Sequence, residues 1–177
     1  GLYNRRGLSE VSRRAIGRAL RRQRPLSAIF LDIDHFKQFN DSYSYAVGDL
    51  VLCALAATLQ ANVREGDLVS RYGGEEFFIL LPEIGREEAV EIAEQLCKAV
   101  AAEQVQTLHG ALTVTISLGV ATRMLPPDVT PGDGNCEAQI LAGLIEEAGR
   151  MLHVAKTNGR NRVAAASGSA WEPASAG

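Results

Sequence analysis

Two adjacent glycines, Gly73 and Gly74, constrain the fold most, because they separate two apolar runs at residues 68–72 and 76–81. Two such runs joined by glycines are typical of an antiparallel hairpin with a tight turn. Glu75 and Glu76 follow the glycines directly. A turn without side chains lets a ligand approach the backbone closely, and the two acids could then hold a metal ion and a phosphate. A plain hairpin turn with solvated glutamates is the better explanation of this segment taken alone.

A second acidic cluster makes a metal site more plausible than a plain hairpin turn. The apolar run at residues 26–32 ends in Asp32 and Asp34. Because side chains alternate along a strand, both carboxylates should point to one face and Ile33 to the other. Facing the Gly-Gly-Glu turn, they would form an oxygen-rich site suited to Mg²⁺, and paired metals about 3.5–4 Å apart are a common device for displacement at phosphorus. The alternative, an N-cap of the next helix, suits Asp34 better than it suits both acids.

Bulk composition describes an ordinary globular chain. The 177 residues are 46% hydrophobic and 22% charged, enough for one well-cored domain. The net charge of −3 gives no electrostatic argument for a nucleic-acid polymer as partner, although arginines gather near the N-terminus. No membrane contact is predicted, because there is neither an apolar span nor a signal peptide. Three cysteines without metal-ligand spacing, of which Cys53 and Cys97 fall in helical patterns near the core, suggest a cytoplasmic protein.

Periodicity predicts an α+β fold. Helices are expected at residues 8–23, 36–43, 47–62, 87–105 and 140–156, and strands at 26–32, 68–72, 76–81, 112–121 and 162–165. The core order β-α-β-β-α-β is that of a ferredoxin-like or palm-type domain, with an antiparallel central sheet flanked by helices. This topology would bring Glu75 near Asp32. Residues 125–135 are expected to form a flexible loop, and the Ala/Ser/Gly-rich tail at 166–177 to be disordered.

Six motifs occur in a recognisable order. They are Gly-Leu-Tyr-Asn-Arg-Arg at 1–6, Leu-Asp-Ile-Asp-His-Phe-Lys at 31–37, Asn40 with Gly48-Asp49, Arg-Tyr-Gly-Gly-Glu-Glu-Phe at 71–77, Thr-Ile-Ser-Leu-Gly-Val-Ala at 115–121, and Ala-Lys-Thr-Asn-Gly-Arg-Asn-Arg at 155–162. Through them the chain resembles the catalytic GGDEF domain of diguanylate cyclases, with a domain expected at residues 1–165. That family joins two GTP molecules into cyclic di-GMP and releases two pyrophosphates.

The resemblance implies roles for the acidic residues. Asp32, Glu75 and the main-chain carbonyl of Ile33 would hold Mg²⁺, with Mn²⁺ as an alternative. Glu75 would also take the proton from the GTP 3′-hydroxyl. Glu76 should face the other side of the hairpin if the strand has already begun there.

The resemblance also implies a nucleotide site. Asn40 and Asp49 would recognise guanine, because an acid accepts hydrogen bonds from a donor pair that adenine lacks. Lys156 and Arg160 would bind the triphosphate. An N-cap role for Asp49, and helix-dipole complementation by the two cations, are the structural alternatives. Further substrate contacts are expected from Phe36, Lys37, Tyr45, Gly73 and Gly74.

Arg64 and Asp67 match the family's Arg-x-x-Asp inhibitory site, which binds the cyclic di-GMP product away from the active centre. Arginine can fork onto guanine or phosphate, and the acid can accept from guanine. Arg-x-x-Asp recurs often by chance, but here it has the expected offset from Gly73. Product inhibition is therefore predicted, as coupling between two distinct sites.

Some positions depart from the family pattern. Tyr45 stands where the family has histidine, and Gly149 and His153 replace an acid and a tyrosine near the C-terminus. An active cyclase would need a two-fold homodimer, since one protomer holds half of the reaction. An upstream regulatory domain is expected to be missing from this fragment. The alternatives are a degenerate module that senses GTP or cyclic di-GMP without turnover, and a cyclase that makes another cyclic dinucleotide.

Overall fold

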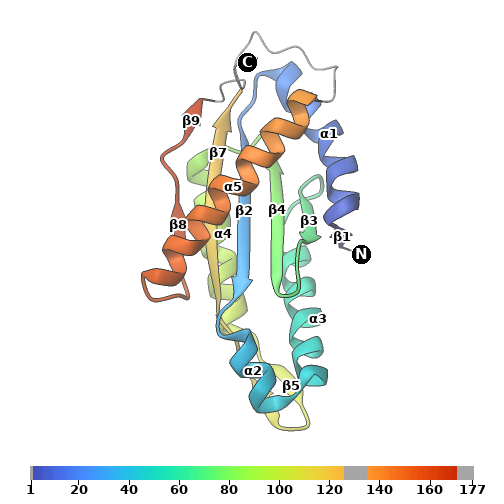
Figure 1. Ribbon diagram of the computed structural model, residues 1–177, viewed down its shortest axis with the longest axis vertical. Coiled ribbons are helices and arrows are strands. Elements are labelled where there is room, and N and C mark those ends of the chain that lie inside the picture. The colour runs from blue at the N-terminus through green and yellow to red at the C-terminus, as the bar shows by residue number, and fades with distance from the viewer. Residues whose placement is uncertain (1, 126–134, 171–177) are drawn as a thin grey trace.

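A central sheet with helices on both faces organises the computed structural model, which describes residues 2–125 and 135–170 (Figure 1). The sheet has seven strands, in the order β1-β3-β4-β2-β7-β8, with β9 also paired to β7. Each neighbouring pair among its middle four strands, β3, β4, β2 and β7, is antiparallel, which confirms the predicted ferredoxin-like core. The bounds are β1 Tyr3–Asn4, β2 Leu26–Ile33, β3 Leu68–Arg71, β4 Glu76–Pro82, β7 Ile116–Met124, β8 Val163–Ala165 and β9 Ser169–Ala170.

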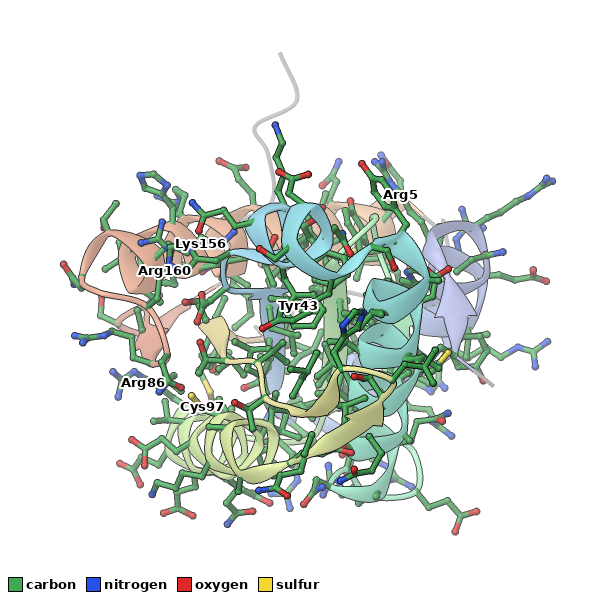
Figure 2. All side chains as sticks on the ribbon, turned by 90° about the horizontal axis from the view of Figure 1, so that it is seen from below. Arg5, Tyr43, Arg86, Cys97, Lys156 and Arg160 are labelled. Carbon is green, nitrogen blue, oxygen red and sulfur yellow. The ribbon has the colours of Figure 1, made fainter. Side chains whose placement is uncertain are left out.

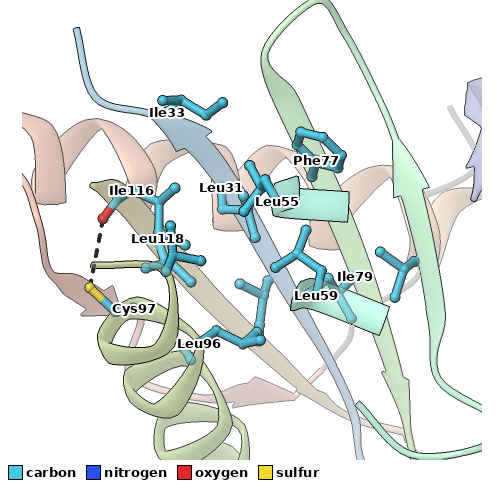
Figure 3. Packing of buried hydrophobic residues seen from close by; sticks show 14 of the residues in the cluster. Leu31, Ile33, Leu55, Leu59, Phe77, Ile79, Leu96, Cys97, Ile116 and Leu118 are labelled. Carbon is cyan, nitrogen blue, oxygen red and sulfur yellow. Dashed lines mark hydrogen bonds between the residues drawn. The ribbon is translucent and has the colours of Figure 1, made fainter. Parts of the chain in front are cut away.

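Four long helices cover this sheet. The helices α1 (Arg5–Arg22) and α5 (Asn135–Thr157) pack on one face, while α3 (Tyr45–Ala61) and α4 (Arg86–Ala102) pack on the other (Figure 1). The short α2 (Phe36–Tyr43) follows the end of β2. Every residue of β2 is buried, because the strand lies between both layers. Figure 3 shows how Leu31, Leu55 and Leu118 pack in the layer beneath α3 and α4.

Alternation along β2 assigns its side chains to the two layers. Ile29 and Leu31 belong to the cluster with α3 and α4, whereas Ala28 and Phe30 belong to the cluster with α1 and α5. Continuing this period of two, Asp32 faces the side of α5. The strand thus delivers the predicted acid to the layer that contains the C-terminal helix.

Helix α5 rests directly on the backbone of β7. A Cβ atom added at Gly119 would lie 2.1 Å from the carbonyl oxygen of Ala148 and 2.1 Å from the amide nitrogen of Leu152. Only glycine permits so close an approach between a strand and a helix. This contact fixes the distance of α5 from the sheet and hence the position of the residues at the end of the helix.

The structure differs from the predicted elements between α4 and β7. A separate hairpin, β5 (Val105–Thr107) with β6 (Gly110–Leu112), occupies the end of the predicted helix and the start of the predicted strand. Gly110 has a φ of +94°, which glycine adopts without cost and which periodicity does not reveal. Strand β7 begins later than predicted, at Ile116. It extends to Met124 because β2 pairs with it from Ile116 to Arg123 and β9 pairs with Arg123 and Met124.

The predicted tail also differs in part. Ser169 and Ala170 pair with Arg123 and Met124 of β7, so this stretch is a strand rather than disordered. Residues 171–177 of that tail, and residues 126–134 of the predicted loop, lie outside the described residues.

Two cysteines that were expected near the core divide between surface and interior. Cys97 is buried, and its Sγ donates to the carbonyl oxygen of Ile116 at 3.7 Å (Figure 3). Cys53 is exposed, so its expected place near the core was wrong. Within residues 2–125 and 135–170, no helix combines the length and apolarity needed to cross a membrane.

Candidate functional site

The two acidic segments meet at one end of the central strands. Asp32 of β2 is the register partner of Glu76 of β4, which places Glu75 beside the end of β2. Glu75 lies close enough to Asp32 for the two negative charges to interact. The predicted approach of Glu75 to Asp32 is therefore what the structure shows.

The Gly-Gly turn is held by its own backbone and by an arginine. The amides of Tyr72 and Gly73 both donate to the carbonyl oxygen of Glu76, at 2.8 and 3.2 Å. Arg71 donates from Nε and Nη2 to the carbonyl oxygen of Gly74, at 3.1 and 2.7 Å. A Cβ at Gly73 would lie 2.5 Å from the Oε2 of Glu76. Arg71 thus helps to shape the turn, a role that sequence reasoning missed although the residue directly flanks the glycines.

The electrostatics of the acid pair suit a cation. Burial raises the pKa of Asp32, and Lys156, whose Nζ lies 2.7 Å from Oδ1, partly opposes that shift. Burial also raises the pKa of Glu75, and the charge of Asp32 raises it further. Two carboxylates that resist ionisation because they are desolvated and close together would be stabilised by a bound positive charge.

Mg²⁺ fits this donor set. The described residues contain no ready-made group of three His, Cys, Asp or Glu side chains that could hold a metal. Mg²⁺ does not require one, because it is usually bound through one or two carboxylates, with waters and substrate phosphates completing an octahedron. Asp32, Glu75 and the carbonyl oxygen of Ile33 would be the protein ligands.

Asp34 has a different task from Asp32. Its carboxylate accepts hydrogen bonds from Ser117 Oγ at 2.6 Å, Thr115 Oγ1 at 2.7 Å and the Asn161 amide at 3.0 Å. Helix α2 begins after His35 with no side-chain cap, so the N-cap interpretation of Asp34 was wrong. Through these three hydrogen bonds, Asp34 links the end of β2 and the start of β7 to the segment after α5.

The predicted guanine-binding residues lie on neighbouring helices. Asn40 of α2 has a buried Oδ1 without a hydrogen-bond partner among the described residues. This oxygen lies only 1.9 Å from where a Cβ of Gly48 would stand, which brings Asn40 next to Asp49. Asp49 lies inside α3, which begins at Tyr45, so the N-cap alternative was wrong for this residue too. An orphan acceptor beside an exposed carboxylate is a suitable partner for the donors of a purine edge.

A cavity of about 610 Å³ lies next to these residues. Its walls include Asp49 and Gly73, together with Tyr3 and Asn4 of the N-terminal strand, but not Asn40. The volume falls within the range of small-molecule pockets. Tyr45, predicted to contact substrate, has 77% of its surface exposed, and none of the described contacts ties its ring to this cavity.

The predicted phosphate-binding cations lie at the end of α5. Lys156 is in the last helical turn, where the helix dipole also favours a cation, and its ion pair with Asp32 places it at the acidic site. Arg160 follows the helix, and Figure 2 shows both residues close together. On α2, Phe36 is buried and Lys37 is exposed.

The Arg-x-x-Asp pair forms at the opposite end of β4. Arg64 Nε lies 3.2 Å from Asp67 Oδ1, and the Arg64 amide donates to Oδ2 at 3.0 Å. Burial raises the pKa of Asp67, while its hydrogen bonds and charge interaction with Arg64 act against that shift. Arg64 also bonds the carbonyl oxygen of Pro82, the last residue of β4. A cavity of about 340 Å³ here is lined by Arg18, Arg22, Arg64, Glu65, Gly66, Pro82 and Glu83.

Solved structures support the fold. The active GGEEF domain of a diguanylate cyclase from Vibrio cholerae matches with a TM-score of 0.80 at 33% identity, covering 96% of this chain and 100% of that domain. The GGDEF domain of DgcB from Caulobacter crescentus, solved in complex with c-di-GMP, matches with a TM-score of 0.77 at 28% identity, covering 93% of this chain and 91% of the other.

Curated relatives with similar sequences point to the same family as the solved structures. The response regulator PleD of Caulobacter vibrioides is 37% identical over 165 residues, which cover 92% of this chain and 34% of PleD. Diguanylate cyclase DgcM of Escherichia coli is 38% identical over 166 residues, which cover 94% of this chain and 37% of DgcM. The chain therefore spans about a third of the length of these relatives. The family model for the diguanylate cyclase GGDEF domain matches residues 1–162. The chain belongs to the diguanylate cyclase GGDEF-domain family.

Proposed function

We propose that this domain condenses two GTP molecules into cyclic di-GMP and releases two pyrophosphates. The observation that carries the proposal is the meeting of Asp32, Glu75 and Lys156 beside the Gly73-Gly74 turn. Two carboxylates and a cation beside a turn of small residues offer what phosphoryl transfer requires, namely charge neutralisation and positioning. A cytoplasmic location, where GTP is present, goes with this proposal.

Each residue of the site has a task in this reaction. Glu75 accepts the proton of the GTP 3′-hydroxyl as the general base, from its position beside Asp32 at the end of β2. Lys156 exchanges its ion pair with Asp32 for the phosphates when nucleotide arrives, and Arg160 adds a second cation. Mg²⁺, held by Asp32, Glu75 and the Ile33 carbonyl, would neutralise phosphate charge and polarise the α-phosphorus.

Guanine is selected by hydrogen bonding. Asp49 accepts from the N1–H and N2 amino donors of guanine, and Asn40 pairs with the purine ring edge through an amide whose oxygen has no partner among the described residues. Adenine would leave Asp49 without donors, so ATP is rejected. Phe36, Lys37, Gly73 and Gly74 supply further contacts around the base and phosphates.

Two further features belong to the proposal. Catalysis requires two protomers in two-fold arrangement, because each site holds one of the two nucleotides that must react with each other. Product binding at Arg64 and Asp67 inhibits the reaction, because cyclic di-GMP offers the guanine edges and phosphates that an arginine–carboxylate pair recognises.

A sensor that binds nucleotide without turnover is the second candidate function. The exposure of Tyr45 favours it, because this ring does not line the substrate pocket. The two functions separate on incubation with GTP and Mg²⁺, followed by chromatography of the products. We expect cyclic di-GMP from the unmodified domain, none from Glu75→Gln, and none with ATP as the substrate. GTP binding with no product at any protein concentration would favour the sensor.

A further inference from the structure

The segment after α5 has an unfavourable backbone. Three consecutive residues, Gly159, Arg160 and Asn161, have φ values of +111°, +61° and +46°. Glycine adopts this left-handed region freely and asparagine tolerates it, but arginine does not prefer it, and runs of such residues are unusual. A conformation of this kind persists only where the surroundings hold it, and such strain is concentrated at functional sites.

Asp34 supplies one of the anchors. Its Oδ2 accepts from the amide of Asn161 at 3.0 Å, directly after Arg160. The carboxylate is 7% exposed and is fixed from the other side by Thr115 and Ser117 of the β7 segment. A hydrogen bond to a carboxylate is stronger than one between two neutral groups. Such a bond, held in a fixed geometry, can therefore restrain a strained loop.

Neighbouring bonds close the loop on both sides of Arg160. The Arg160 amide donates to Ala155 at 3.1 Å, and the Arg162 carbonyl accepts from Leu118 at 3.0 Å. Asp32 in β2 and Asp34 just after it therefore have different partners, since Asp32 binds Lys156 on the helix while Asp34 binds the loop that carries Arg160.

We propose that Asp34 is a positioning residue for triphosphate binding, acting through the Asn161 amide to hold Arg160 in its left-handed conformation. The inference rests on the proposed function, in which Arg160 contacts the phosphates. Without the anchor, the loop can relax to ordinary φ values and Arg160 leaves its place. The loss should then fall on affinity for the phosphates and not on affinity for guanine.

The test measures binding by calorimetry with two probes, guanosine and a GTP analogue with a methylene bridge between the α- and β-phosphorus atoms. Asp34→Asn preserves size but replaces one acceptor oxygen with an NH₂ donor. We expect this variant to bind the analogue about tenfold more weakly, the effect of one charge-assisted hydrogen bond, and guanosine as before. Thr115→Val, which removes a donor to Asp34 at nearly constant volume, should produce a smaller loss of the same kind.

A double-mutant cycle with Arg160→Ala distinguishes positioning from general damage. If Asp34 acts through Arg160, the double variant binds the analogue within about twofold of Arg160→Ala alone. Full additivity, or equal weakening of guanosine binding, would overturn the positioning role. If Arg160→Ala itself left analogue binding intact, the triphosphate assignment of the proposed function would be wrong and the inference would fall with it. Should Asp34→Asn not fold, Thr115→Val takes its place in the cycle.

Discussion

Replacement of Gly119 by alanine should destabilise the domain strongly although it adds a single methyl group. The new Cβ would lie 2.1 Å from two backbone atoms of α5 and 2.7 Å from the carbonyl carbon of Met151. These neighbours are main-chain atoms of a hydrogen-bonded helix and cannot rotate away as a side chain can. The helix must therefore move from the sheet by about 1–1.5 Å, since packed non-bonded atoms prefer about 3.5–4 Å and the nearest main-chain atoms would lie at 2.1 Å.

That displacement affects every buried side chain along α5. Ile140, Leu144 and Leu152 lie in the layer between α5 and the sheet, and their exposed fractions are 5% or less. A gap of 0.5–1 Å forfeits about a quarter to a half of the dispersion energy of each contact. Overpacking costs typically about 1–3 kcal/mol, and an immobile backbone places this site at the upper end, so we expect a loss of about 3 kcal/mol.

Urea denaturation followed by circular dichroism measures this loss, and the same helix provides the control. Gly149 lies in α5 with nothing within 4 Å of its Cβ position. Gly149→Ala should therefore stabilise the domain by about 0.5–1 kcal/mol, the difference in helix propensity. A Gly119→Ala variant within about 0.5 kcal/mol of the unmodified domain would refute the described packing of α5 on β7.

Three further predictions concern the site. Because burial raises the pKa of Glu75, protons compete with Mg²⁺ for its carboxylate. Mg²⁺ affinity, measured by titration at several pH values, should therefore rise with pH through that raised pKa and then level off. Gly48→Ala should raise the KM for GTP about tenfold, because the new Cβ would displace the Asn40 oxygen 1.9 Å away; an unchanged KM would contradict the guanine role of Asn40. Asp67→Asn should raise the cyclic di-GMP concentration for half-inhibition about tenfold in progress curves, with the initial rate as reference, by removing the charged partner of Arg64.

The central elements were predictable because they obey simple periodicities. The predicted strand at residues 26–32 and helix at 36–43 correspond to β2 and α2, since an apolar run buried on both faces and a short amphipathic segment leave little choice. The encounter of Asp32 with Glu75 followed from the topology, because antiparallel pairing of β2 with β4 places the turn beside the strand end.

Other features depend on contacts between residues remote in sequence. The bonds from Thr115, Ser117 and Asn161 to Asp34 span more than 80 positions, so no local pattern predicts that Asp34 is an anchor and not a helix cap. The hairpin at Gly110 depends on a positive φ, and the sequence does not show which glycines adopt one. Sequence reasoning therefore found both acids, but the hydrogen bonds that Asp34 accepts from Thr115, Ser117 and Asn161 are visible only in the structure.

The most direct test of the account is the rate of cyclic di-GMP formation at saturating GTP and Mg²⁺, measured against domain concentration. If two protomers each present one nucleotide, the rate should rise with close to the second power of concentration while the dimer is scarce, and become linear once it predominates. Glu75→Gln should form no product across the series. A rate strictly proportional to concentration throughout, with the domain monomeric by light scattering, would contradict the two-fold mechanism.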